Sequence, residues 1–378
     1  MSCSAQTEDL AALPDKTRYL AEVLVANTWE CNLNCSYCFV RNGELAASHA
    51  RMSPAMAVQV VDALDRGLRH VEKISIHFYG GEPLTNVPAI EAMVNRAAEK
   101  GMGRFGFAMT TNGAIPDSQA VYELLDKGNF QIILSIDGPE QIHDQCRRTA
   151  AGEPTHEKVL KFLSGIRAHT RCWVRGSAVV RSGWGLNEAV SYLASLPVDA
   201  IKAQAVRTRD HTPYALTGFE RARYLRELEE IGEFVIRELE AGRAPKDDRF
   251  SSRVLQLLAG KKRESFCGAG YTTFGITPDG VILPCILMER SGRELGHIND
   301  EGSAWLQRGM EWRERHRNRV ECRDCDALVL CGGGCESVMS VCGEDECELI
   351  RKNCEVATSI YRHFRSSPIK LLALAGVV

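Results

Sequence analysis

The chain has 378 residues, of which 44% are hydrophobic and 25% are charged, and this balance excludes a mainly disordered protein. Its 46 Lys and Arg residues against 49 Asp and Glu residues give a net charge of −3, which argues against generic binding of a nucleic-acid backbone. The unusual number is the 15 cysteines. At about 150 residues per domain, the length favours two to three structural units.

The redox state of the cysteines depends on the cellular compartment of the protein. Residues 1–15 lack the basic and apolar regions of a secretory signal, and the apolar run 371–378 is too short to span a bilayer. We therefore expect a cytoplasmic protein whose thiols stay reduced. Because the cysteine count is odd and the chain is long, metal ligation is favoured over disulfides.

Strands and helices are predicted to alternate over the first half of the chain. Apolar β-rich runs predict strands at 20–27, 74–79, 105–110, 131–136, 173–180 and 200–206. The segments between them predict helices at 53–66, 88–100, 117–127, 155–169 and 186–195. This pattern indicates a parallel sheet, and the nearly continuous apolar runs predict strands buried on both faces. Periodicity alone fits both a (β/α) barrel and an open doubly wound sheet.

Three cysteines follow the first predicted strand directly, in the sequence Cys31-Asn-Leu-Asn-Cys35-Ser-Tyr37-Cys38. This is the carboxyl end of a strand, where α/β folds place their chemistry. Three thiolates on an iron–sulfur cube leave one iron free for another ligand, whereas structural zinc needs a fourth ligand nearby. The spacing therefore favours an iron–sulfur site over zinc.

The spacing Cys-x3-Cys-x-aromatic-Cys resembles the signature of radical SAM enzymes, with Tyr37 at the aromatic position. The resemblance implies that Cys31, Cys35 and Cys38 hold a [4Fe–4S] cluster whose fourth iron is chelated by S-adenosylmethionine (SAM). In that family, one electron from the cluster cleaves SAM to a 5′-deoxyadenosyl radical. The family's fold implies a partial (β/α)6 barrel related to the TIM barrel.

Further motifs of that family follow in chain order. The strands at 74–79, 105–110 and 131–136 lead into Gly-Gly-Glu-Pro, Thr-Thr-Asn-Gly and Ser-x-Asp-Gly, and an Arg comes soon after. Glu82 can accept a hydrogen bond from a ligand ammonium group, and the planar fork of Arg147 suits a carboxylate. The resemblance implies that SAM is bound by Tyr37, Gly80, Gly81, Glu82, Pro83, Thr111, Asn112, Ser135, Asp137 and Arg147.

A charged segment at 218–243 has apolar residues at helical spacing, which predicts an amphipathic packing helix. A second interpretation is that this helix and its neighbouring loop contact a substrate. The polar residues 244–252 are predicted to form a linker.

The last third of the chain holds most of the remaining cysteines. The patterns Cys-x12-Gly-x4-Cys and Cys-x2-Cys-x5-Cys-x3-Cys, followed by a later Cys, resemble the SPASM extension of radical SAM maturases. The resemblance implies two auxiliary iron–sulfur clusters. One would be held by Cys322, Cys325, Cys331 and Cys354, and the other by Cys267, Cys285 and Cys335.

The second of these sets lacks a fourth cysteine. Some members of the group carry a Cys six positions before the first ligand, where this chain has Lys261. Cys342 and Cys347 are spare thiols in the same region. Structural zinc is the alternative for the whole region.

These patterns together divide the chain into an N-terminal segment (1–19), a radical SAM core barrel (20–210), a helical linker region (211–260), a SPASM domain (261–365) and a C-terminal tail (366–378). The resemblance implies an oxidoreductase that abstracts hydrogen from a residue of a ribosomally made peptide or protein. The product would be a C–C, C–S or C–O crosslink or a related change. Expected partners are that substrate, a reductant such as flavodoxin or ferredoxin, and a separate leader-binding protein, but neither nucleic acid nor membrane.

Other substrates remain open. Anaerobic sulfatase-maturating enzymes share several of these motifs but place an Asp base directly after the Cys of Gly-x4-Cys, where this chain has Ile286. That difference weighs against a formylglycine-forming enzyme, and no general base can be identified. The alternatives are a radical SAM enzyme acting on a small molecule and, more remotely, a zinc-binding interaction protein.

Overall fold

The computed structural model describes residues 20–38, 40, 50–69, 71–101, 103–208, 212–288, 292–300, 304–316, 322–374 and 376. The predicted N-terminal segment 1–19 lies outside the described residues. No described helix is both long and apolar enough to cross a membrane.

All six predicted strands of the first half are present, with ends within one or two residues of those expected. They are β1 (Leu20–Thr28), β2 (Lys73–Gly80), β3 (Phe105–Thr111), β4 (Gln131–Ser135), β5 (Trp173–Val180) and β6 (Ala200–Ala205). They pair in parallel in the order β6-β5-β4-β3-β2-β1. The order never reverses, so the sheet winds in one direction as a barrel does and has no switch point of a doubly wound fold.

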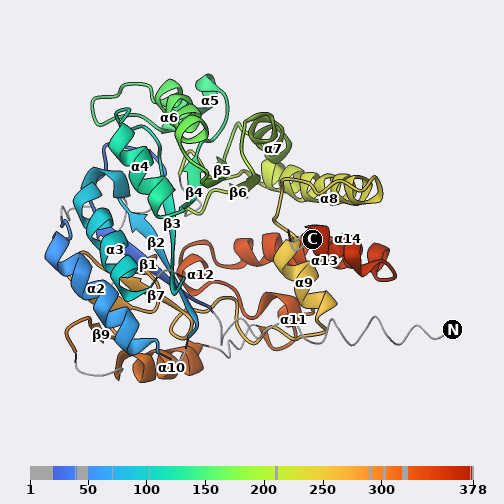
Figure 1. Ribbon diagram of the computed structural model, residues 1–378. Helices are drawn as coiled ribbons and strands as arrows, with labels where there is room; N and C mark the ends of the chain where they lie inside the picture. Colours follow the sequence, from blue (N-terminus) through green and yellow to red (C-terminus); the bar gives the residue numbers. More distant parts are fainter. Residues whose placement is uncertain are drawn as a thin grey trace.

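The predicted helices lie between these strands and cover one face of the sheet (Figure 1). The first begins where Ser53 accepts a hydrogen bond from the Met56 amide and Pro54 occupies the first turn, both strong helix-start signals. Buried apolar side chains of helices and strands form one continuous core. The covering helices are α2 (Pro54–Gly67), α3 (Val87–Lys100), α4 (Gln119–Lys127), α5 (Glu140–Cys146), α6 (His156–His169) and α7 (Leu186–Ser195), with a short 3-10 helix η3 (Pro83–Asn86).

The expectation that the strands are buried on both faces is wrong for β4 and β5. Along β5, every second residue is buried against the helices, while the alternate residues are half-buried or exposed. The same alternation runs along β4. The inner wall of an incomplete barrel faces a space that must admit ligands, so it carries polar and half-exposed side chains.

The cysteine-rich region continues the same sheet. Its strand β7 (Thr273–Ile276) pairs in parallel with β1, and β8 (Val281–Leu283) and β9 (Gly296–His297) follow antiparallel. Sequence alone did not indicate this continuity. The remaining helices are α10 (Ala304–His316), α11 (Leu328–Cys331), α12 (Glu336–Cys342), α13 (Glu344–Phe364) and α14 (Pro368–Leu374), the last within the predicted tail.

The predicted linker 244–252 is a mostly irregular segment that connects two helices, and it is partly buried. Ile201 of β6 pairs with Asp247, which accepts a hydrogen bond of 2.8 Å from Arg249 Nε, and both partners of that ion pair are buried. The helix α9 (Ser251–Leu258) begins within this segment. The charged helix α8 (Gly218–Glu240) packs against α13, as Figure 1 shows, so one of its faces is a packing surface as expected.

Candidate active site

The motif residues come together where β1 to β4 end. The cysteine segment follows β1, Gly81 and Glu82 follow β2, Asn112 follows β3 and Asp137 follows β4. Because parallel strands end at one edge of a sheet, residues up to 100 positions apart in sequence meet there. Hydrogen bonds join them into two networks.

The cysteine segment is held by the chain that follows α5. The Asn34 amide donates to the Arg148 carbonyl at 2.7 Å, and the Ser36 amide donates to the Cys146 carbonyl at 3.1 Å. Leu33 forms an isolated bridge with Thr149. Cys146, which sequence analysis left unassigned, is thus a buried thiol beside this segment.

The three thiols form a donor set suited to a cationic cluster. Burial raises the pKa of Cys31 to about 12 and that of Cys35 to about 11, and the neighbouring cysteines add to both shifts. Arg147 opposes the shift at Cys35. Several desolvated thiolates can coexist only beside strong positive charge, which a metal cluster bound by three cysteines supplies.

The two glycines at the end of β2 lie against the backbone that leads into the cysteine segment. The Gly81 amide donates to the Thr28 carbonyl at 3.0 Å, and the Glu82 amide donates to the Glu30 carbonyl at 2.8 Å. Gly80 has φ of +122°, and a Cβ there would collide with the Thr28 carbonyl. These glycines therefore permit a close approach of two loops, and their contact with SAM stays a prediction.

We expect Gly81→Ala to destabilise the protein by roughly 1 to 3 kcal/mol through overpacking. Its Cβ would lie less than 3.0 Å from backbone atoms of Trp29 and Glu30, which cannot move without shifting Cys31. Thermal unfolding measures the effect. Gly106→Ala in β3 is the matched control, because a Cβ there meets no atom within 4 Å, and equal melting temperatures for the two variants would refute the prediction.

Glu82 joins the loops after β2 and β3. It is 1% exposed, and its carboxylate accepts hydrogen bonds from the Leu84 amide (3.1 Å), the Thr111 hydroxyl (2.8 Å) and the Asn112 amide (2.7 Å). Burial raises the pKa of Glu82 to about 7, against the effect of these donors. A cationic ligand group at this carboxylate would restore its charge.

Asn112 extends this network to the first cysteine. Its Nδ2 donates to Asn32 Oδ1 at 2.9 Å and lies 3.7 Å from Cys31 Sγ. Asn32 Nδ2 in turn donates to the Ala114 carbonyl at 2.6 Å. Sequence reasoning missed Asn32, although its position between two ligating cysteines is the signal that could have identified it.

The second network centres on Asp137, which is fully buried. Its Oδ2 accepts hydrogen bonds from Arg147 Nε (3.0 Å) and from the Tyr37 hydroxyl, and its Oδ1 accepts one from the Val179 amide (3.0 Å). Burial opposes ionisation, but Arg147 and these donors outweigh burial and hold the pKa of Asp137 below its usual value. The guanidinium of Arg147 also lies 5.5 Å from the centre of the Tyr37 ring.

The two remaining predicted SAM contacts lie at the same edge. Pro83 is buried at the start of η3, and its carbonyl accepts a hydrogen bond from Asn27 Nδ2 at 3.0 Å. Ser135 is half-buried at the last position of β4. All ten residues expected to contact SAM thus follow or end β1 to β4, and their contacts with it remain predictions.

An apolar cluster lies between this site and the cysteine-rich region. Ile286 is 2% exposed and packs in a cluster with Ala26, Trp29 and Val40, which also touches Tyr79 and Cys38. Burial raises the pKa of Tyr79 to about 12, and both Cys38 and Cys285 contribute, so Tyr79 lies near thiols of both regions.

The later cysteines fall into the two predicted groups. Burial raises the pKa of Cys285 to about 12, and the charges of Cys267 and Cys335 add to the shift, which makes these three thiols neighbours. Cys331 and Cys354 share an apolar cluster with Leu330 and Ile350. In the described part of the chain, no three His, Cys, Asp or Glu side chains lie close enough to share one metal ion.

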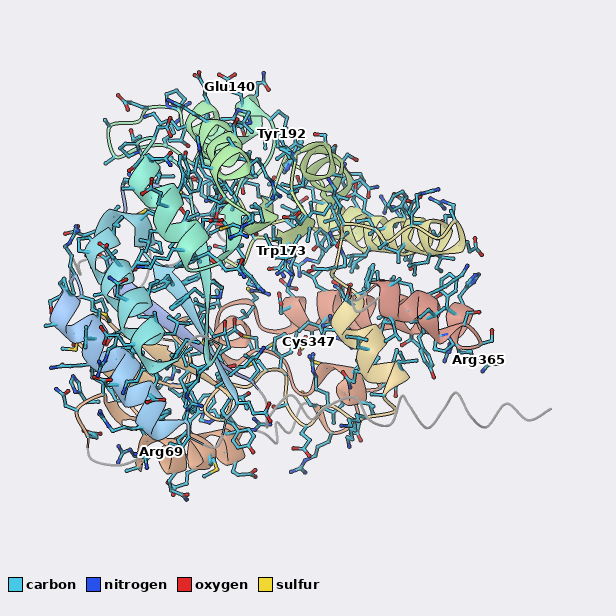
Figure 2. All side chains as sticks on the ribbon, in the orientation of Figure 1. Arg69, Glu140, Trp173, Tyr192, Cys347 and Arg365 are labelled. Carbon is cyan, nitrogen blue, oxygen red and sulfur yellow. The ribbon has the colours of Figure 1, made fainter. Side chains whose placement is uncertain are left out.

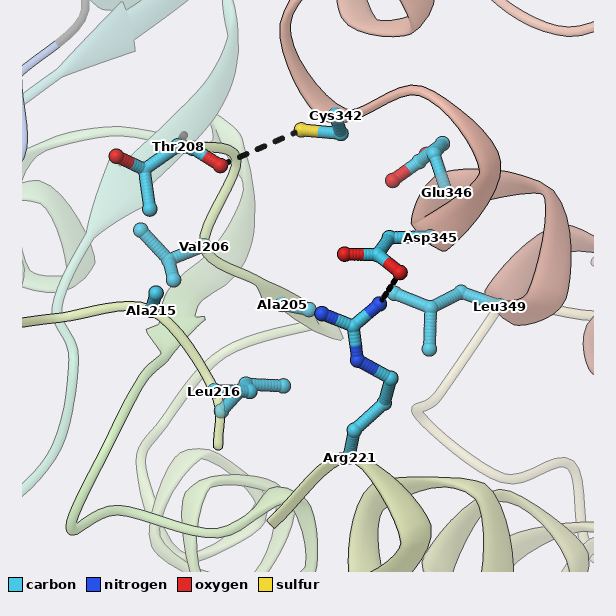
Figure 3. A pocket seen from close by; sticks show the side chains of 10 residues that line it. All are labelled: Ala205, Val206, Thr208, Ala215, Leu216, Arg221, Cys342, Asp345, Glu346 and Leu349. Atoms are coloured by element: carbon cyan, nitrogen blue, oxygen red, sulfur yellow. Dashed lines mark hydrogen bonds and ion pairs between the residues drawn. The ribbon is translucent and has the colours of Figure 1, made fainter. Parts of the chain in front are cut away.

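The two spare thiols differ in their surroundings. Burial raises the pKa of Cys347, and Cys322, Cys331 and Cys325 contribute, so Cys347 lies with the second group. Cys342 instead lines a pocket at the end of β6, where its Sγ is 3.9 Å from the Thr208 carbonyl oxygen (Figure 3). An ion pair between Arg221 of α8 and Asp345 of α13 closes one side of this pocket.

Comparison with known protein families accounts for both regions. Residues 30–176 match the radical SAM superfamily, and residues 267–326 match SPASM, an iron–sulfur cluster-binding domain. The radical SAM cyclopropyl synthase TigE of Paramaledivibacter caminithermalis is 26% identical over 193 residues, which span 48% of this chain and 40% of that enzyme. A cysteine-type anaerobic sulfatase-maturating enzyme of Clostridium novyi is 22% identical over 342 residues, covering 81% of this chain and 84% of that enzyme.

Solved structures share the fold across nearly the whole chain. The sulfatase maturase anSMEcpe with bound AdoMet has a TM-score of 0.78 at 20% identity, covering 95% of this chain and 98% of that chain. Streptococcus suis SuiB bound to its precursor peptide SuiA has a TM-score of 0.58 at 17% identity, covering 88% and 74% of the two chains. At these identities the likeness establishes the fold.

Proposed function

We propose that this chain, a radical SAM enzyme with a C-terminal SPASM domain, is a maturase that abstracts hydrogen from a residue of a ribosomally made peptide or protein. The product would carry a C–C, C–S or C–O crosslink or a related modification. We assign the radical SAM core to residues 20–210 and the SPASM domain to 261–365, with the helical region 211–260 between them.

One observation carries the proposal. Three cysteines and both hydrogen-bond networks meet at one edge of the barrel, while the thiols of Cys267, Cys285 and Cys335 gather beside the same sheet. A [4Fe–4S] cluster and SAM at the first three cysteines supply a 5′-deoxyadenosyl radical. Auxiliary clusters at the later cysteines place electron-transfer centres within the same molecule.

The residues of this chain would position SAM by charge and shape. We infer that Glu82 takes the SAM ammonium group, because it is a buried carboxylate with an elevated pKa. Arg147, held by Asp137 and Tyr37, presents a fixed cation toward the SAM carboxylate. The apolar cluster around Ile286 would keep water out of the adjoining SAM site.

A peptide substrate is supported by the neighbours of this fold. SuiB has been solved with its precursor peptide SuiA, and anSMEcpe has been solved with the Kp18Cys peptide. Alternate side chains along β4 and β5 are half-buried or exposed, which supports an inner surface that a peptide could contact. A reductant such as flavodoxin or ferredoxin, and a separate leader-binding protein, belong to the same proposal.

The sulfatase-maturase alternative is disfavoured by one position. Where those enzymes carry a base, Ile286 is 2% exposed within an apolar cluster and offers no group that could accept a proton. A small-molecule substrate is the remaining alternative.

The test is anaerobic incubation of the reconstituted protein with SAM, dithionite and the product of a short open reading frame beside its gene, followed by mass spectrometry. We expect a loss of two hydrogens or another defined mass change in the peptide, together with 5′-deoxyadenosine. SAM cleavage with every such peptide left unchanged would overturn the peptide assignment. A peptide containing a sulfatase motif serves as the control and should stay unmodified.

A further inference from the structure

Two cationic side chains lie on the inner wall of the barrel, away from the cysteine segment. Lys202 of β6 faces the interior, because its neighbours Ile201 and Ala203 are buried in the core beneath the helices. Arg175 of β5 faces the same way, since Val174 and Gly176 on either side of it are buried. Neither residue takes part in the networks at the cysteine segment.

Lys202 is in register with the proposed SAM site. Ser135, at the end of β4, pairs with Ser177 of β5, which pairs with Lys202 of β6. Because neighbouring strands lie about 4.8 Å apart, the Cα atoms of Ser135 and Lys202 are roughly 10 Å apart across the wall. An extended lysine side chain therefore reaches the space beside a ligand that contacts Ser135.

The positive charge on this wall is incompletely paired. Asp248 forms an ion pair with Arg175 Nη2, but Arg175 Nε is buried and has no hydrogen-bond partner among the described residues. No described carboxylate lies within 4.0 Å of Lys202 Nζ. Burial lowers the pKa of Lys202 to about 8 despite Asp248, and Arg175, Arg207 and Arg249 add to the lowering.

One aromatic ring adjoins Arg175. The Arg175 guanidinium lies 5.1 Å from the centre of the Trp173 ring, and Trp173 at the start of β5 is 36% exposed (Figure 2). A half-buried cation that lacks a full set of partners destabilises a fold, and such groups are characteristic of sites where a ligand supplies the missing charge.

We propose that Lys202 and Arg175, beside Trp173, form a subsite that binds a carboxylate of the substrate. The inference rests on the proposed function, in which an unmodified peptide carries negative charge only as carboxylates. Two sources are available, an Asp or Glu side chain near the modified residue and the peptide's own C-terminus. The SAM carboxylate is the less suitable occupant, because we assign it to Arg147, which Asp137 holds at the edge of the sheet.

The subsite is tested in the reconstituted enzyme with Lys202→Met and with peptides in which one carboxylate at a time is an amide. We expect Lys202→Met to raise the peptide KM by about 10- to 100-fold, as loss of a hydrogen bond to a charged group does. With the wild-type enzyme, only one of the amide peptides should show a KM raised by the same factor. The position of its amide identifies the bound carboxylate as a side chain or the C-terminus. That peptide should show no further loss with Lys202→Met.

Two controls separate this subsite from a structural role. Lys158→Met removes a lysine that is 48% exposed on α6 and should leave the peptide KM unchanged. Lys202→Met should melt at or above the wild-type temperature, because it removes a half-buried charge that no described carboxylate pairs, whereas a structural lysine would lower the melting temperature when lost. An unchanged KM for Lys202→Met, or a lowered melting temperature, would overturn the inference.

A measurement that requires no turnover tests the subsite independently of the proposed function. Reductive methylation of Lys202 in the wild-type protein, followed by mass spectrometry, should be slowed by acetate and not by acetamide. If no peptide is modified while acetate still protects Lys202, the peptide assignment fails and the carboxylate subsite stands. Equal labelling in acetate and acetamide contradicts the subsite whatever the peptide result.

Discussion

Replacing Cys35 with alanine is expected to abolish formation of 5′-deoxyadenosine from SAM. Cys35 is one of three thiols on the segment after β1, and the resemblance to radical SAM enzymes makes all three cluster ligands. The loss of one cluster should lower the iron content by about four atoms per chain while the auxiliary clusters remain. Iron assay and chromatography of the reaction after anaerobic reconstitution measure both effects.

Cys172→Ala is the matched control for this variant. Cys172 is also a free cysteine, but it is 2% exposed at the start of β5, where its Sγ donates to the Leu125 carbonyl at 3.3 Å. This control should keep its iron and its cleavage of SAM. If Cys35→Ala retains wild-type cleavage, the first cysteine segment is not the site of the radical chemistry.

Asp137→Asn is expected to produce the second largest effect. The substitution keeps the size of a fully buried side chain but leaves Arg147, which is 9% exposed, without its partner. Breaking one half of a buried ion pair costs roughly 3 to 5 kcal/mol of folding free energy. Because Arg147 would also lose its fixed orientation, we expect the KM for SAM to rise at least about tenfold.

Urea unfolding and SAM-dependent kinetics measure these two effects. Glu153→Gln is the control, since Glu153 and Lys158 form an ion pair whose side chains are 62% and 48% exposed. A surface pair of this kind contributes at most about 1 kcal/mol. Equal urea midpoints for Asp137→Asn and Glu153→Gln would show that the network around Asp137 does not stabilise the site.

Much of the fold follows from local sequence patterns. Continuous apolar runs and helix-start signals such as Ser53-Pro54 predict all six barrel strands and five helices to within two residues of their ends. The choice between a barrel and a doubly wound sheet depends on strand order, which is a non-local property that periodicity does not contain. The pairing of β7 with β1 is non-local for the same reason.

The interior side chains were harder to predict than the elements. Strand β5 alternates between buried and half-exposed residues, but Trp173 and Val179 make its exposed side look apolar in sequence. The polar composition of 244–252 predicts a linker but does not show that Asp247 and Arg249 pair with each other in a buried site. Charge pairing between side chains is not a local signal.

The motifs predicted which residues meet, and the structure adds how they are joined. Spacing alone places Glu82 and Asp137 at strand ends, yet only the fold shows that each is a buried hydrogen-bond centre. Likewise, Cys342 and Cys347 cannot be distinguished by spacing, but Cys347 lies with the second thiol group and Cys342 lines a separate pocket. Lys202 belongs to no sequence motif. Its relation to the site follows from the pairing register of β4, β5 and β6.

The central claim is that this chain cleaves SAM to a radical at Cys31, Cys35 and Cys38. The most direct measurement is anaerobic incubation of the reconstituted wild-type protein with SAM and dithionite, with 5′-deoxyadenosine and methionine quantified together. The account predicts that both form in equal amounts and that omitting either the reductant or the iron prevents their formation. A protein that holds its full complement of iron and produces no 5′-deoxyadenosine under these conditions would contradict it.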